Sequence, residues 1–287
     1  MRGLGYVLGQ CAVSMLLGVG ALRAVQAPAG DPNAVLAAAR EAMGGEKRLS
    51  AVKTFVATGR TQQVRGDNLV PIEFEISCEL PDKYIRRDEI PAQESGPTTI
   101  GFNGDALIQL PAAAPPPARA GAPAPTPEQL DAQKRARVTT AKQDFARLTL
   151  GMFAASFSSY PLTFSYVGQA EAPQGKADVL EAKGPANFTA RLFVYSETHL
   201  PIMVSWQGAT APARGRGPAA APAGGPAPAQ PPAVENRIYF ADFRDVDGMK
   251  FPFRLRRAVG SDTVEETTFD RFRINAKIDA KKFEASK

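Results

Sequence analysis

The sequence predicts an α+β protein that is mainly β, with about eleven antiparallel strands, one long helix and one short N-terminal helix. Three observations support this prediction. Apolar and polar residues alternate with a period of two over many segments, one amphipathic stretch is long enough for a major helix, and strand patterns are not interleaved with helical ones. A parallel nucleotide-binding sheet is therefore excluded, because it needs strands and helices in alternation.

Residues 1–29 are predicted to be a signal peptide. Arg2 precedes a short apolar run over 11–22, which is followed by the small-residue tract 24–29. The run is too short to span a bilayer comfortably, so we expect no stable membrane span after processing. The alternative is an uncleaved N-terminal anchor. With the leader removed, a periplasmic chain keeps one cysteine, Cys78, and has no internal disulfide.

The short helix is predicted over 33–43, directly after the leader. Asp31 is a suitable N-cap, Pro32 fits the first helical position, and Gly44-Gly45 ends the helix. A short turn over 46–50 is expected to connect it to the first strand.

The strand pattern is clearest over 69–80, where apolar residues occupy one face and glutamates and a serine occupy the other. Such alternation indicates a sheet with one solvated face, which favours antiparallel pairing. Asn103-Gly104 predicts a two-residue hairpin between two of the strands, and Asp247-Gly248 predicts another turn of this kind. The segments with strand patterns are 53–64, 69–80, 83–90, 98–102, 106–110, 162–169, 178–183, 188–197, 201–207, 237–244, 250–259 and 263–274.

The long helix is predicted to begin at a capping box. Thr126 is the N-cap, Pro127 takes the first helical position, and Gln129 stands three residues after the cap. Apolar residues then recur at spacings of three and four, to about residue 155. These residues are Val138, Ala141, Phe145, Leu148 and Met152.

Two stretches rich in Pro and Ala, 111–127 and 209–233, are predicted to be disordered insertions within one domain that covers 31–287. The first holds seven Pro and seven Ala, and the second holds seven Pro and ten Ala. Neither composition can build a packed core. Strand patterns continue on both sides of each stretch, so we expect insertions in loops rather than linkers between domains.

The charge and the histidine content exclude several classes of function. The net charge of +5 is carried by the leader and the two insertions, and the remaining chain has 29 Lys and Arg against 29 Asp and Glu. A nucleic-acid partner is therefore not expected. His199 is the only histidine, and without a second such group no nucleophile–base pair or histidine-rich metal site can be named. We expect His199 to be an exposed turn residue, and we expect no enzyme, catalytic residue, metal or cofactor.

Six short segments at turns and strand ends carry a resemblance to a known family: 42–49, 54–60, 101–105, 197–206, 243–252 and 275–279. With them the chain resembles bacterial periplasmic proteins of the outer-membrane lipoprotein-sorting (LolA-like) superfamily. The resemblance implies an unclosed, strongly curved antiparallel sheet, a half-barrel, which wraps around the helices and leaves an apolar cavity for acyl chains. It also implies an arginine inside that cavity which helps to hold the closed state. Arg60, Arg86, Arg87 and Arg191 are all candidates for this arginine.

The leading hypothesis is a periplasmic binding or carrier protein, monomeric and without covalent chemistry. Its ligand would be apolar or acylated, a lipid or a lipoprotein. The alternative is an envelope interaction or scaffold protein with a filled core and no lipid ligand, and the sequence leaves both open. Large apolar residues near the end of the long helix and in a late strand are the candidate ligand-binding residues. They are Phe145, Leu148, Met152, Phe153, Phe157 and Trp206.

Overall fold

The computed structural model describes residues 30–91, 93–94, 96–112, 125–172, 175–209 and 233–284. The predicted signal peptide and most of both predicted insertions lie outside these residues. Within the described ranges, no helix is long and apolar enough to cross a membrane.

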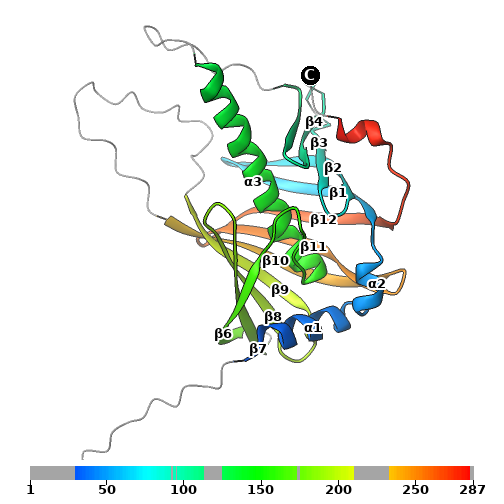
Figure 1. The fold of residues 1–287 in the computed structure, drawn as a ribbon, viewed down its shortest axis with the longest axis vertical. Coiled ribbons are helices and arrows are strands. Elements are labelled where there is room, and N and C mark those ends of the chain that lie inside the picture. The colour runs from blue at the N-terminus through cyan, green and yellow to red at the C-terminus, as the bar shows by residue number, and fades with distance from the viewer. Residues whose placement is uncertain are drawn as a thin grey trace, which may run out of the picture.

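Twelve strands of the described chain form one antiparallel sheet that does not close (Figure 1). The order is β5-β4-β3-β2-β1-β12-β11-β10-β9-β8-β7-β6, so β1 pairs with β12 at the centre while β5 and β6 are the two edges. The predicted fold class is confirmed: each of the twelve segments with a strand pattern forms a strand, against the overall estimate of about eleven. The bounds are β1 (Thr54–Arg65), β2 (Asn68–Glu79), β3 (Lys83–Glu89), β4 (Thr98–Asn103), β5 (Ala106–Leu110), β6 (Thr163–Ala172), β7 (Gly175–Gly184), β8 (Phe188–Tyr195), β9 (Pro201–Ala209), β10 (Ala233–Val246), β11 (Met249–Val259) and β12 (Asp262–Ile274).

The helices begin where local capping signals place them. In α1 (Pro32–Ala42) the Asp31 carboxylate accepts a hydrogen bond from the backbone N–H of Asn33. In α3 (Pro127–Phe153) Thr126 and Gln129 form both bonds of the capping box. The remaining helices are short, α2 (Glu46–Ser50) and the 3-10 turn η1 (Ala280–Phe283).

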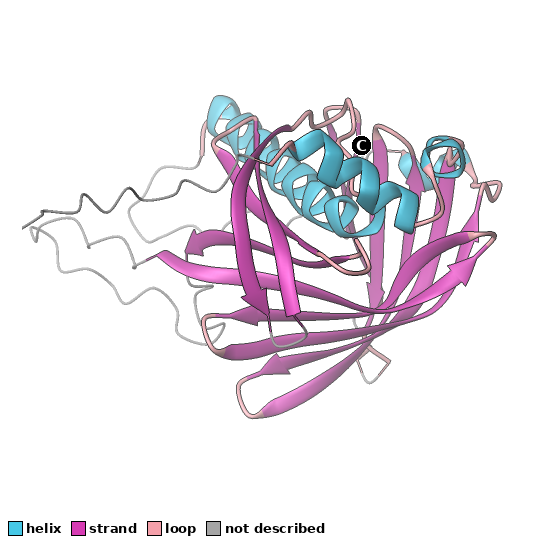
Figure 2. Ribbon diagram, turned by 90° about the horizontal axis from the view of Figure 1, so that it is seen from below, coloured by secondary structure: helices cyan, strands magenta, loops and turns pink. Residues whose placement is uncertain are grey.

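The helices α1 and α3 lie on one side of the curved sheet, which we call the inner face (Figure 2). Strand register defines this face at β8, β9 and β10, where Leu192, Val204 and Ile238 are consecutive cross-strand partners and are buried. The side chains that alternate with these three point to the opposite side, the outer face. The two faces therefore carry different residues of the same strands.

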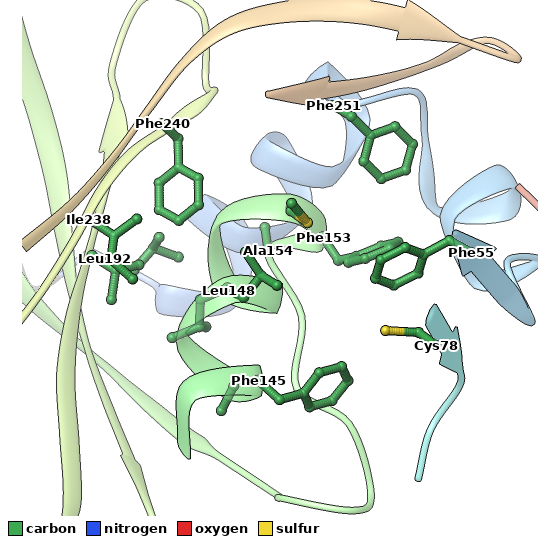
Figure 3. Close-up of a cluster of buried hydrophobic side chains, with 14 of the residues drawn as sticks. Phe55, Cys78, Phe145, Leu148, Phe153, Ala154, Leu192, Ile238, Phe240 and Phe251 are labelled. Carbon is green, nitrogen blue, oxygen red and sulfur yellow. The ribbon is translucent and has the colours of Figure 1, made fainter. Parts of the chain in front are cut away.

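The core lies between α3 and the inner face and is rich in aromatic rings (Figure 3). The ring centroid of Phe153 lies 5.7 Å from that of Phe55 and 5.6 Å from that of Phe251. Gly151 allows α3 to approach β10 closely, because a Cβ atom at this position would lie 2.1 Å from the ring of Phe240. Cys78 is fully buried in the same core, as predicted.

The end of the chain covers part of the outer face. Ile85 of β3 and Ile108 of β5 both pair with Gly101 of β4 and lie on the side away from the core. They form a separate cluster with Phe283 of η1, against which the half-buried Ile278 packs. Near these side chains, the Asn103 side chain donates a hydrogen bond of 3.1 Å to the carbonyl oxygen of Phe283.

Candidate ligand cavity beneath the long helix

A cavity of about 270 Å³ lies between α3 and the inner face of the sheet. Ala141 and Leu148 of α3 line one side of it, and Ile76, Ile238 and Phe269 line the sheet side. The first turns of α3, residues 127–137, are exposed, and its buried residues begin at Val138. Only the second part of α3 therefore covers the sheet.

Strand register brings charged groups into this apolar space. Arg86 pairs with Ile76 and Asp88 pairs with Phe74, and both of these β2 partners belong to the core face. Arg257 pairs across β11 and β12 with Glu265, on the same inner face.

Four charged groups at the cavity, Arg86, Asp88, Arg257 and Glu265, form one connected network, while Asp144 pairs with Arg147 instead. The Nε of Arg86 lies 2.7 Å from Asp88, and one of its terminal nitrogens lies 3.9 Å from Glu265. Arg257 approaches the other oxygen of Glu265 at 3.9 Å. Two buried hydroxyls, Thr61 and Thr267, are 2.9 Å apart, and they hydrogen-bond Arg86 and Glu265 respectively. Each buried charge thus has partners, as burial requires.

The electrostatics keep this network charged. Burial alone lowers the pKa of Arg86, but the nearby carboxylates of Asp88 and Glu265 outweigh it and raise the pKa above its ordinary value. Burial raises the pKa of Tyr84, so this phenol is neutral at physiological pH. The cavity therefore combines apolar walls with charged groups, among them the guanidinium groups of Arg86 and Arg257.

Of the four arginines considered as candidates for a position inside the cavity, Arg86 fits best. It lines the cavity, and its guanidinium stacks 4.8 Å from the ring centre of Phe74. Arg60 pairs with Asp270 and Arg87 pairs with Glu89, both with largely exposed side chains. Arg191 is also exposed.

The six predicted ligand-binding residues occupy different surroundings. Leu148 lines the cavity. Phe145, Met152 and Phe153 are almost fully buried in the core, and the half-buried Phe157 contacts the rings of Phe145 and Phe153 at 5.9 and 5.8 Å. Trp206 is also half-buried, on β9. The helix end thus brings three phenylalanines together, while Trp206 lies apart from them against another side chain of α3.

That side chain is Arg147, which the sequence analysis missed together with the network around Arg86. Its guanidinium lies 4.4 Å from the Trp206 ring centre and 5.1 Å from that of Phe188, and it also pairs with Asp144 at 2.9 Å. Burial lowers the pKa of Arg147, and its buried Nε has no hydrogen-bond partner in the described chain. The sequence did carry a signal for Arg147, because it is the single cation in the run 145–153, whose other residues are uncharged.

Other kinds of site are not seen among the described residues. No group of three His, Cys, Asp or Glu side chains there could hold a metal ion. His199 is an exposed residue with a left-handed backbone (φ +56°) between β8 and β9.

Comparison with known proteins gives structural likeness only. No family model matches the sequence, and no curated protein matches it either. The crystal structure of a LolA superfamily protein from Nitrosomonas europaea is 14% identical and covers 89% of this chain and 98% of its own, with a TM-score of 0.52.

Two further crystal structures have lower scores. A putative outer membrane lipoprotein-sorting protein domain from Vibrio parahaemolyticus is 9% identical, covers 88% of this chain and 97% of its own, and has a TM-score of 0.48. A DUF1329 family protein from Desulfovibrio piger is 8% identical, covers 89% and 98%, and has a TM-score of 0.44. The likeness to the Nitrosomonas protein shows that this chain has the LolA-like fold expected from its motifs.

Proposed function

We propose that this chain is a periplasmic binding or carrier protein for an apolar or acylated ligand, a lipid or a lipoprotein. The ligand would enter between α3 and the inner face. The observation that supports this most is the apolar-walled cavity beneath α3 in a LolA-like half-barrel. The charged groups that line it are all engaged in ion pairs, so the site suits binding rather than covalent chemistry.

The size of the cavity sets a condition on the proposal. Its volume of about 270 Å³ lies just below the range of roughly 300–1,000 Å³ that is usual for ligand sites. An acyl chain would therefore enter only as α3 moves outward, which would expose Leu148 and then the phenylalanines at the helix end. Because residues 127–137 are exposed, such a movement breaks the packing contacts of the second part of α3 together with the hydrogen bond from Arg137 to Gln109 of β5.

The packed helix end supports a second candidate, an envelope interaction or scaffold protein without a lipid ligand. Phe145, Met152 and Phe153 are between 0 and 2% exposed. Under this alternative the same residues are core, and the cavity is a minor packing defect.

Binding of a fluorescent long-chain fatty acid to the full chain distinguishes the carrier proposal from the scaffold alternative. Trp206 is the only tryptophan, and it lies on the inner face. The carrier proposal predicts that the probe quenches Trp206 emission in a saturable manner, as expected of one inner-face site per chain. Wild-type protein that leaves Trp206 emission unchanged at saturating probe would contradict it.

A matched pair of substitutions on α3 strengthens this experiment. Leu148→Arg places a charge at the cavity, whereas Leu130→Arg makes the same change at a position that is 40% exposed. The carrier proposal predicts that Leu148→Arg abolishes binding while the protein stays folded, since the helix can move outward. Unfolding by Leu148→Arg, measured by thermal melting, would favour the scaffold. Leu130→Arg should change neither binding nor melting.

A further inference from the structure

A hollow larger than the inner cavity lies on the outer face, and no residue of α3 lines it. Its volume is about 720 Å³, and its lining comes from all the strands between β6 and β12. This is well inside the size range of small-molecule sites. We call it the outer groove.

Strand register places the outer groove on the opposite side of the sheet from the inner cavity, and Leu255 and Thr267, in the strands between them, line both hollows. Phe193, Met203 and Tyr239 are consecutive cross-strand partners on β8, β9 and β10. Each is adjacent in sequence to one of the inner-face residues Leu192, Val204 and Ile238, so it points to the other side. All three are half-buried and line the groove.

Small residues make the groove hollow. Ala170 of β6, Ala177 of β7 and Ala241 of β10 line it beside the larger Phe193 and Tyr239. Ala170 and Ala177 are cross-strand partners. Alanines between aromatic side chains leave an apolar depression, rather than the polar surface expected of a solvated face.

Arginines of β11 border this depression. Arg256 is the cross-strand partner of Tyr239, and its guanidinium lies 4.3 Å from the Tyr239 ring centre. Arg254 is the partner of Ala241, one step further along the strand. Both arginines are exposed, and neither forms a salt bridge within the described ranges.

The other charged groups leave these two cations available. Arg237 also lines the groove, but it is bound to Glu235 and to the carbonyl oxygen of Gly260. The acidic lining residues are Glu266, across from Arg256, and Glu171, on the far strand β6. The positive charge is thus concentrated at the β11 side, and the apolar surface extends from there toward β7.

At the β11 side of the groove, β11 has a partner strand on both sides, whereas β6, at the far side, is an edge strand. Recognition at β11 therefore falls to side chains. An apolar depression about 14 Å across, from Phe193 to Arg256 at the usual strand spacing, suits an alkyl chain. Guanidinium groups at its end suit a carboxylate, which they bind through paired hydrogen bonds.

We infer that the outer groove is a second binding site, for a single-chain amphiphile with an anionic carboxylate head. The head would lie at Arg254 and Arg256, and the chain would lie over Met203 and Phe193. This site is independent of the proposed inner-face function, and either can fail without the other.

Methionine methyl NMR of the full chain tests this with dodecanoate as the probe. Met203 lines the outer groove, whereas Met43, Met152 and Met249 are buried in the core. The inference predicts that dodecanoate shifts the Met203 methyl signal in a saturable manner, while dodecyltrimethylammonium, with the same chain and a cationic head, binds at least about tenfold more weakly. A methyl shift confined to Met152, together with quenching of Trp206 emission, would place dodecanoate only at the inner face and would overturn the outer site. Equal binding of the two probes would overturn the role of the arginines.

Charge reversal provides the second arm of the experiment. Arg254→Glu combined with Arg256→Glu should weaken dodecanoate binding at Met203 by about tenfold or more. Arg271→Glu combined with Arg273→Glu makes the same change on the same face at exposed positions outside the groove and should leave binding unchanged. Equal losses in both double variants would show a general charge effect and contradict the site.

Ala241→Phe, which fills the depression without changing charge, should also abolish the Met203 shift. Retained binding in that variant would contradict the site even where the charge variants fold poorly.

Discussion

The outer face of the sheet carries two apolar patches, and the described residues cover only one of them. At β3 and β5, Ile85 and Ile108 are 5% and 0% exposed because Phe283 of the C-terminal turn lies over them. At β8 and β9, Phe193 and Met203 remain half-buried at the outer groove. The same side of one sheet is therefore a small second core in one half and an open surface in the other.

Because of this difference, we expect the covered patch to contribute to stability and the open patch to contribute to binding. Side chains that the chain itself buries contribute to the free energy of folding in every molecule. Apolar surface left open contributes less, and a sizeable open patch on a soluble protein is typical of an interaction site. Substitutions of the same kind in the two halves should therefore have opposite consequences.

The largest effect is expected from Phe283→Ala. Phe283 is 1% exposed, and loss of a buried phenylalanine typically costs about 3 kcal/mol or more of unfolding free energy. Urea unfolding followed by circular dichroism measures this change. We also expect Ile85 and Ile108 to become accessible, so that the variant binds an apolar dye more strongly than wild type. A loss below about 1 kcal/mol would show that the C-terminal turn does not hold the covered half together.

A smaller loss of stability is expected from Phe193→Ala, the same substitution in the open half. Because Phe193 is only half-buried, we expect about 1 kcal/mol in the same urea experiment. Dodecanoate binding at Met203 should nevertheless be lost, whereas Phe283→Ala should preserve it. Equal destabilisation by the two variants would remove the distinction between the halves.

The parts of the fold that depend on neighbouring residues could be predicted from the sequence. Asp31 starts α1 and the Thr126–Gln129 capping box starts α3, because each cap is formed within a few residues. Strict alternation likewise predicts that Cys78 is buried. The curvature of the sheet came from the resemblance of the motifs and not from these patterns.

The surroundings of the two sites depend on contacts between residues that are distant in sequence, so they were harder to predict. On β3, Ile85 faces outward and Arg86 faces the inner cavity, the reverse of what hydrophobicity predicts. The reason is that Phe283, about two hundred positions later in the chain, covers the outer side. The outer groove was missed for a similar reason, since register across four strands brings Phe193 and Met203 beside Arg256.

The smallest effect is expected on the pH dependence of stability, through the salt bridge that attaches the C-terminal turn to the outer face. Lys282 of the C-terminal turn forms a salt bridge with Glu75 on the outer face of β2, and the Ser77 hydroxyl lies 3.3 Å from the same carboxylate oxygen. Burial alone raises the pKa of Glu75, but the hydrogen bond and charge of Lys282 outweigh it and hold the pKa below its ordinary value of 4.5. A carboxyl with a lowered folded-state pKa stabilises the protein above its unfolded pKa, and this contribution is lost as the pH falls through the folded value. Because the pair is partly exposed, we expect Glu75→Gln to cost less than about 1 kcal/mol at pH 7, and we expect this cost to shrink as the pH falls below 4.5. Urea unfolding of both proteins across this range measures the difference, and a cost that persists unchanged at pH 3 would show that the Glu75 charge does not anchor the turn.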